Sequence, residues 1–117
     1  MKKNDKNFEK ALIKKLTIIC EEFKLTSDGF SWLTHSVNFK DIANSLTIYC
    51  IYDTEKQRKQ AEINGEQKAL TAAITAVINE LSVVIKPSRK VVRFDSEQAC
   101  EISHKGNWQA RLQQTFH

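Results

Sequence analysis

The chain has 117 residues, of which 41% are hydrophobic, three are glycines and one is proline. This length suits one domain with a single core, so we expect residues 1–117 to form one domain. The composition excludes a disordered tail, a collagen-like repeat and a disulfide-dense miniprotein. The net charge of +4 is compatible with a polyanionic partner, although solubility alone explains it equally well.

The cysteines and the N-terminal residues indicate the cellular compartment in which the protein is expected. The three cysteines are far apart and form no Cys-x-x-Cys pair, which is typical of reduced structural thiols. Lys14 and Lys15 interrupt the first apolar run, and no small-residue cleavage site follows it, so it does not read as a signal peptide. No apolar stretch approaches the roughly 20 residues of a membrane span. These features predict a cytoplasmic protein.

The first half of the chain predicts one helix and two strands. Apolar residues at steps of three and four indicate a helix from about residue 6 to 24. The turn signal Ser-Asp-Gly at 27–29 is followed by aromatic and β-branched residues that predict a strand at 30–39. A polar connection at 40–45 leads to a second strand at 46–52, and so short a link predicts an antiparallel hairpin.

A broken helix begins the second half. Thr54 and Gln57 have the capping-box spacing that starts a helix, here at about 55–64. Gly65 breaks or kinks this helix, and the apolar spacing within 66–81 predicts its continuation.

The remaining residues predict a strand and two helical segments. Pro87 ends any continuation of the helix, a strand follows at 90–94, and a helix follows at about 96–104. The last segment has an apolar stripe at steps of four, formed by Trp108, Leu112 and Phe116.

These elements predict an α+β fold in the order α-β-β-α(α)-β-α, with a three-stranded sheet and helices packed on one face. Side chains alternate between the two faces of a strand. Leu33, His35 and Val37 are therefore expected on one face, and Phe30 shares the opposite face with Trp32. The opposite face is also expected to include Thr34, Thr47, Tyr49, Ile51, Arg89, Val91 and Arg93.

Catalytic and metal-binding patterns are weak. His35 and Ser36 are adjacent in a strand and point to opposite faces, so they form no dyad. Cys100 and His104 have helical i, i+4 spacing, but a structural zinc site needs four ligands. We therefore predict no catalytic residue, metal or cofactor and identify no small-molecule substrate. An enzyme with a pocket around His35 and Cys50 remains a third hypothesis.

A run of cations suggests a binding surface. The segment 86–93 contains no acidic residue. We expect its cations, with one lysine near the Gly65 kink, to neutralise phosphates. These candidate residues are Lys68, Lys86, Arg89, Lys90 and Arg93. A solvated loop without a partner is the competing interpretation.

The aromatic residues suggest another surface. Trp32 and Tyr49 are expected on the sheet face that the first helices leave open. Aromatic and arginine side chains on an open sheet can stack bases and bind phosphates. Two other interpretations are favoured: the C-terminal segment covers the face, or two copies pair there as a homodimer.

The order of elements over residues 6–95 resembles the type II KH topology and ribosome-binding factor A. Both have a helix, a hairpin, a helix broken at a kink and a final strand. The resemblance implies an RNA-binding groove near the kink at Gly65. The typical G-x-x-G differs here, because Lys68 stands where the second glycine would be.

The stretch 29–35, Gly-Phe-Ser-Trp-Leu-Thr-His, and the ending 95–108 resemble a second group. These are small bacterial proteins, some labelled as regulators related to the factor for inversion stimulation. That label implies DNA binding by a C-terminal helix-turn-helix with a basic second helix. Only Lys105 and Arg111 are basic after Phe94.

The leading hypothesis is a non-enzymatic nucleic-acid-binding module, linked to RNA or the ribosome more than to operator DNA. The alternative is a protein-interaction or homodimerisation domain that uses Trp32 and Tyr49.

Overall fold

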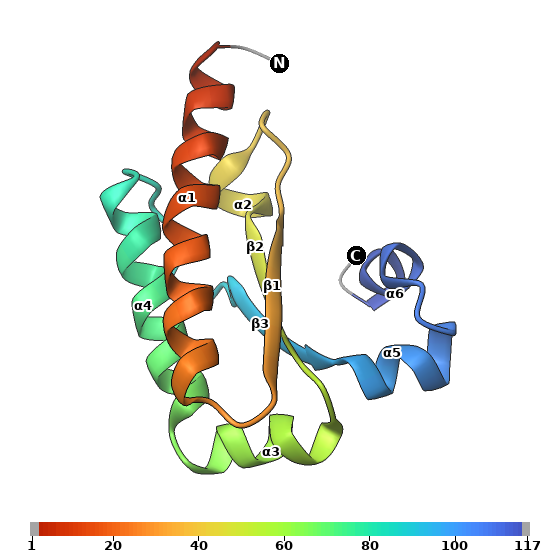
Figure 1. Ribbon diagram of the computed structural model, residues 1–117. Helices are drawn as coiled ribbons and strands as arrows, with labels where there is room; N and C mark the ends of the chain where they lie inside the picture. Colours follow the sequence, from red (N-terminus) through yellow and green to blue (C-terminus); the bar gives the residue numbers. More distant parts are fainter. Residues whose placement is uncertain (1–2, 116–117) are drawn as a thin grey trace.

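The computed structural model describes residues 3–115 as six helices and three strands. Figure 1 shows their arrangement. In chain order they are α1 (Lys3–Thr26), β1 (Phe30–Ser36), α2 (Ile42–Ser45), β2 (Thr47–Tyr52), α3 (Glu55–Ile63), α4 (Glu66–Glu80), β3 (Val92–Ser96), α5 (Glu97–His104) and α6 (Trp108–Thr115).

The sheet has the order β1-β2-β3, with β1 antiparallel and β3 parallel to β2. The α+β class, the three strands and the hairpin are therefore confirmed. Among the described residues no further strand pairs with β3, so its outer side is an open edge of the sheet. The cationic segment leads into this edge strand.

The connection at 40–45 differs from the sequence prediction, because it contains the short helix α2. Ser45 Oγ donates to the Asp41 carbonyl, and Asn44 Nδ2 donates to the Asp41 carboxylate. Such local side-chain bonds favour a turn over an extended connection. The strand predicted at 90–94 begins later, at Val92.

Helices α1 and α4 pack on one face of the sheet (Figure 1). The apolar stripes of both helices meet β2 there, as the helical spacing predicted. The core residues with no exposed surface include Leu12, Leu46, Ile48, Cys50, Tyr52, Leu70 and Ile74.

Phe30 is on the opposite face from the one predicted. The β1–β2 register shifts between Phe30 and Trp32, so that Phe30 pairs with Tyr52 and Trp32 with Ile51. The irregularity turns Phe30 into the core, where its ring lies 5.6 Å from that of Tyr52. Val91 also belongs to this core rather than to the other face.

Helix α6 lies across the sheet from α1 and α4 (Figure 1). The Trp108 ring meets the Trp32 ring edge-on, with centroids 5.1 Å apart. Leu112 lines a groove between α6 and the sheet. Of the two interpretations favoured for this face, coverage by the C-terminal segment is therefore what the structure shows, while Phe116 lies outside the described residues.

The predicted helix start at Thr54 and the predicted break at Gly65 are both present. Thr54 Oγ1 accepts a hydrogen bond from the Gln57 backbone, and Gly65 has φ of +87°. A left-handed φ favours glycine, which explains why one helix ends and the next begins there.

No helix within residues 3–115 is long and apolar enough to cross a bilayer.

The buried phenol of Tyr52 should make the protein less stable at alkaline pH. Burial raises the pKa of the Tyr52 phenol, and its hydrogen bond to Glu66 raises it further. The unfolded chain ionises this group near its ordinary pKa of about 10, whereas the folded chain keeps it neutral. The free energy of unfolding is therefore expected to fall as pH rises above about 10, by up to about 1.4 kcal/mol per pH unit from this group. Urea denaturation at several pH values should show a shallower fall for Tyr52→Phe, and parallel curves would contradict the assignment.

Candidate functional site

The cationic segment runs from the loop after α4 into β3, the edge strand of the sheet. Lys86 is in the loop that follows α4, and Lys90 is two residues before β3. Both side chains are exposed, and within residues 3–115 neither has a hydrogen bond or an ion pair with a carboxylate. Their charges are therefore available to a partner.

Two shallow hollows join these cations. Lys86 and Lys90 line a hollow of about 340 Å³ against α4. Lys90 and Arg93 line a second hollow of about 270 Å³, beside Arg58 of α3. Because Lys90 and Phe94 belong to both, the hollows form one continuous surface along β3. We call Lys86, Lys90 and Arg93 the basic edge.

Acidic groups near the basic edge are few. Glu62 lines the second hollow, so the surface is not uniformly positive. The Arg58 guanidinium is 2.8 Å from the Glu55 carboxylate, and this hydrogen bond raises the pKa of Arg58. The charge of Arg58 is therefore balanced within the protein.

Lys68 is exposed on α4 but lines neither hollow. Its neighbours Gln67 and Thr71 line one hollow each. The structure thus places Lys68 beside the basic edge rather than within it.

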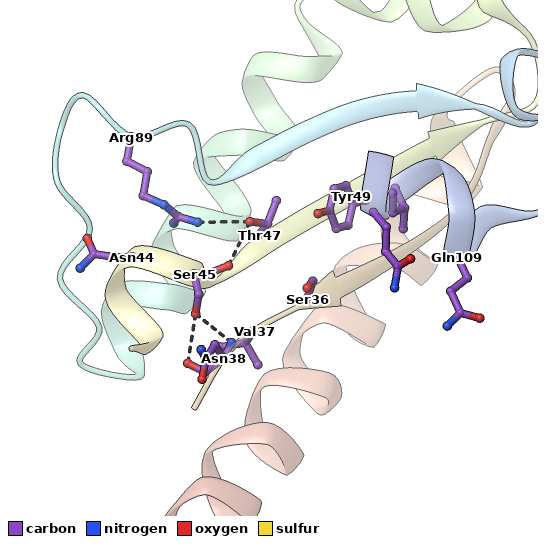
Figure 2. Close-up of a pocket in the computed structure, with 11 residues that line it drawn as sticks. Ser36, Val37, Asn38, Asn44, Ser45, Thr47, Tyr49, Arg89 and Gln109 are labelled. Carbon is purple, nitrogen blue, oxygen red and sulfur yellow. Dashed lines mark hydrogen bonds between the residues drawn. The ribbon is translucent and has the colours of Figure 1, made fainter. Parts of the chain in front are cut away.

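Arg89 also lines the first hollow, beside Lys86 and Lys90, but its guanidinium turns toward the sheet. Nη2 donates to Thr47 Oγ1 at 3.1 Å (Figure 2). Nη1 is buried and has no hydrogen-bond partner in the part of the chain that the structure describes. Arg89 is thus less exposed than Lys86 and Lys90, and its guanidinium lies beside β2.

A groove of about 480 Å³ lies between α6 and the sheet, and Arg89 reaches it (Figure 2). We call it the α6 groove. Its lining residues are Ser36, Val37, Asn38, Asn44, Ser45, Thr47, Tyr49, Arg89, Gln109, Leu112 and Gln113. Apart from Arg89 and Tyr49, sequence reasoning named none of these as site residues. Polar residues scattered over several segments carry no sequence pattern that marks them as a site.

Polar contacts hold α6 in place. Asp95 accepts two hydrogen bonds from Arg111, from Nε at 2.6 Å and Nη2 at 2.9 Å. The Glu97 carboxylate accepts hydrogen bonds from the indoles of Trp32 and Trp108. Arg111 is therefore occupied within the protein, which disfavours α6 as a DNA-reading helix.

Trp32 and Tyr49, predicted as an interface with another molecule, are engaged within this chain. Tyr49 is 5% exposed, and burial raises the pKa of its phenol. Trp32 is half-buried against Trp108. Helix α6 thus covers the aromatic surface that the dimer interpretation needs.

The described side chains that could take part in catalysis do not gather at one site. His35 Nε2 lies 3.2 Å from Glu9 Oε2, which joins β1 to α1. Burial raises the pKa of the Cys50 thiol to about 12, so this thiol is a poor nucleophile at neutral pH. Within residues 3–115, no three His, Cys, Asp or Glu side chains gather as a metal site.

Comparisons with models of known families, with curated proteins and with solved structures give no match to the chain. Any function is therefore inferred from the residues and their arrangement.

Proposed function

We propose that the protein is a non-enzymatic module that binds RNA, free or in the ribosome, through the basic edge. The observation that carries the proposal is that Lys86 and Lys90 are exposed without a carboxylate partner among the described residues. Cations that are not neutralised within the protein can release counterions from a phosphate backbone when they bind it.

The spacing of the cations supports a linear polyanion. Lys90 shares one hollow with Lys86 and the other with Arg93, so the three side chains form a series across the two hollows. A nucleic-acid backbone presents phosphates in such a series. Lys68, which is exposed on the neighbouring helix, would add a further contact.

Single-stranded RNA fits this surface better than operator DNA does. The half-buried ring of Phe94 lines both hollows, and aromatic rings in a basic groove can stack on unpaired bases. A DNA-reading helix needs free basic side chains, whereas Arg111 of α6 is bound to Asp95.

A binding titration tests the proposal. Fluorescence anisotropy should show the protein binding a labelled single-stranded RNA at low ionic strength more tightly than a duplex DNA. The variant Lys86→Gln/Lys90→Gln should bind this RNA about tenfold more weakly, since it loses two phosphate contacts.

The matched control is Lys10→Gln/Lys14→Gln, which removes the same charge from exposed positions on α1. It should bind like the natural sequence. Equal losses in the two variants would show attraction by net charge alone, and tighter binding of duplex DNA would contradict the RNA assignment.

A further inference from the structure

The α6 groove has the size of a small-molecule site. Its volume of about 480 Å³ lies within the range of roughly 300–1,000 Å³ that is usual for small ligands. Gln109, Leu112 and Gln113 of α6 form one wall. The spacing of these three residues places them on one face of the helix.

The charge of the groove is unbalanced. Among the described residues that line it, Arg89 is the only Lys, Arg, Asp or Glu. Asp41, the residue before α2, accepts hydrogen bonds from Asn44 and does not line the groove. Buried or half-buried charges in proteins are usually paired with an opposite charge.

Thr47, the hydrogen-bond partner of Arg89, is neutral and does not supply a negative charge. Thr47 Oγ1 accepts from Arg89 Nη2 and itself donates to the Ser45 carbonyl, at 3.1 Å in both cases. Arg89 Nη1 has no partner among the described residues, although it is buried. An unpaired buried donor is costly, so an oxyanion that reaches this guanidinium would remove an existing penalty.

The other walls suit the rest of such a ligand. Hydroxyl and amide groups from β1, α2, β2 and α6 line the groove together with Arg89 and can donate to or accept from polar atoms (Figure 2). Val37 and Leu112 add apolar contact. A small molecule with one acidic group and a partly apolar body satisfies all of these features.

We propose that the α6 groove binds a small organic anion, whose carboxylate or phosphate group pairs with the Arg89 guanidinium. Arg89 also borders the hollow of Lys86 and Lys90, but neither of these lysines lines the α6 groove, so the proposal does not depend on RNA binding. Helix α6 is part of the site, because it supplies one wall.

Amide chemical shifts of the ¹⁵N-labelled protein test the proposal. Benzoate and phenyl phosphate are the probes, and benzamide and phenol are their neutral counterparts. The anions should cause saturable shifts at residues 36–38, 44–49 and 108–113, and the neutral compounds should bind at least about tenfold more weakly. The two anions distinguish a carboxylate from a phosphate preference.

Two variants locate the binding. Arg89→Gln should weaken anion binding about tenfold or more, whereas Lys86→Gln, which removes the same charge outside the groove, should leave it unchanged. Gln109→Trp fills the groove from an exposed position on α6, so it should block binding even if Arg89→Gln fails to fold.

Three results would overturn the anion site: no saturable shift with either anion, equal binding of the neutral compounds, or equal weakening by Lys86→Gln. These results leave the RNA titration unaffected, because Lys86 does not line the groove. Loss of RNA binding in Lys86→Gln/Lys90→Gln would likewise leave the groove result standing.

Discussion

Arg111→Leu is expected to lower the free energy of unfolding by about 3–5 kcal/mol. Asp95 has a side chain only 8% exposed, and Arg111 binds it with two hydrogen bonds. Removal of the guanidinium leaves a buried carboxylate without its counter-charge, and it also releases α6 from the sheet. Urea denaturation measures the change.

The double variant Asp95→Asn/Arg111→Leu separates these two causes. It removes both charges, so it should be more stable than Arg111→Leu alone. Arg111→Lys, which keeps the charge and loses the two-pronged geometry, should lie between the natural sequence and Arg111→Leu. A loss below about 1 kcal/mol for Arg111→Leu would show that the pair behaves like an exposed one.

Leu70→Ala is expected to cost about 2–5 kcal/mol, because it opens a cavity in the core beneath α4. Leu70 has no exposed surface and packs in the cluster between the helices and β2. The same change at Leu25, which is 86% exposed at the end of α1, should alter stability by less than about 0.5 kcal/mol. Similar losses at the two positions would contradict the placement of the core.

The helices and strands could be predicted because their patterns are local. The apolar stripe of 66–81 and the Thr54–Gln57 cap specify helices by spacing alone, and both are present. The face of Phe30 could not be predicted, because the irregularity at Ser31 depends on pairing with β2. Helix α2 also depends on tertiary context, since its turn is held by side-chain bonds at Asp41.

The site could be predicted only in part. The absence of acidic residues in 86–93 predicted a cationic surface, and Lys86 and Lys90 of this segment are exposed. Sequence alternation could not show that Arg89 turns toward Thr47, because that contact joins residues 42 positions apart. The α6 groove depends on where the C-terminal helix packs, which no local pattern specifies.

The salt dependence of RNA binding tests the role of the basic edge most directly. The logarithm of the binding constant should fall linearly with the logarithm of salt concentration, with a slope of about −0.7 per phosphate contact for a single strand. Lys86→Gln/Lys90→Gln should make this slope shallower by about 1.4, while Lys10→Gln/Lys14→Gln leaves it unchanged. A natural protein that retains no RNA at low ionic strength, or a slope unaffected by loss of Lys86 and Lys90, would contradict the proposed function.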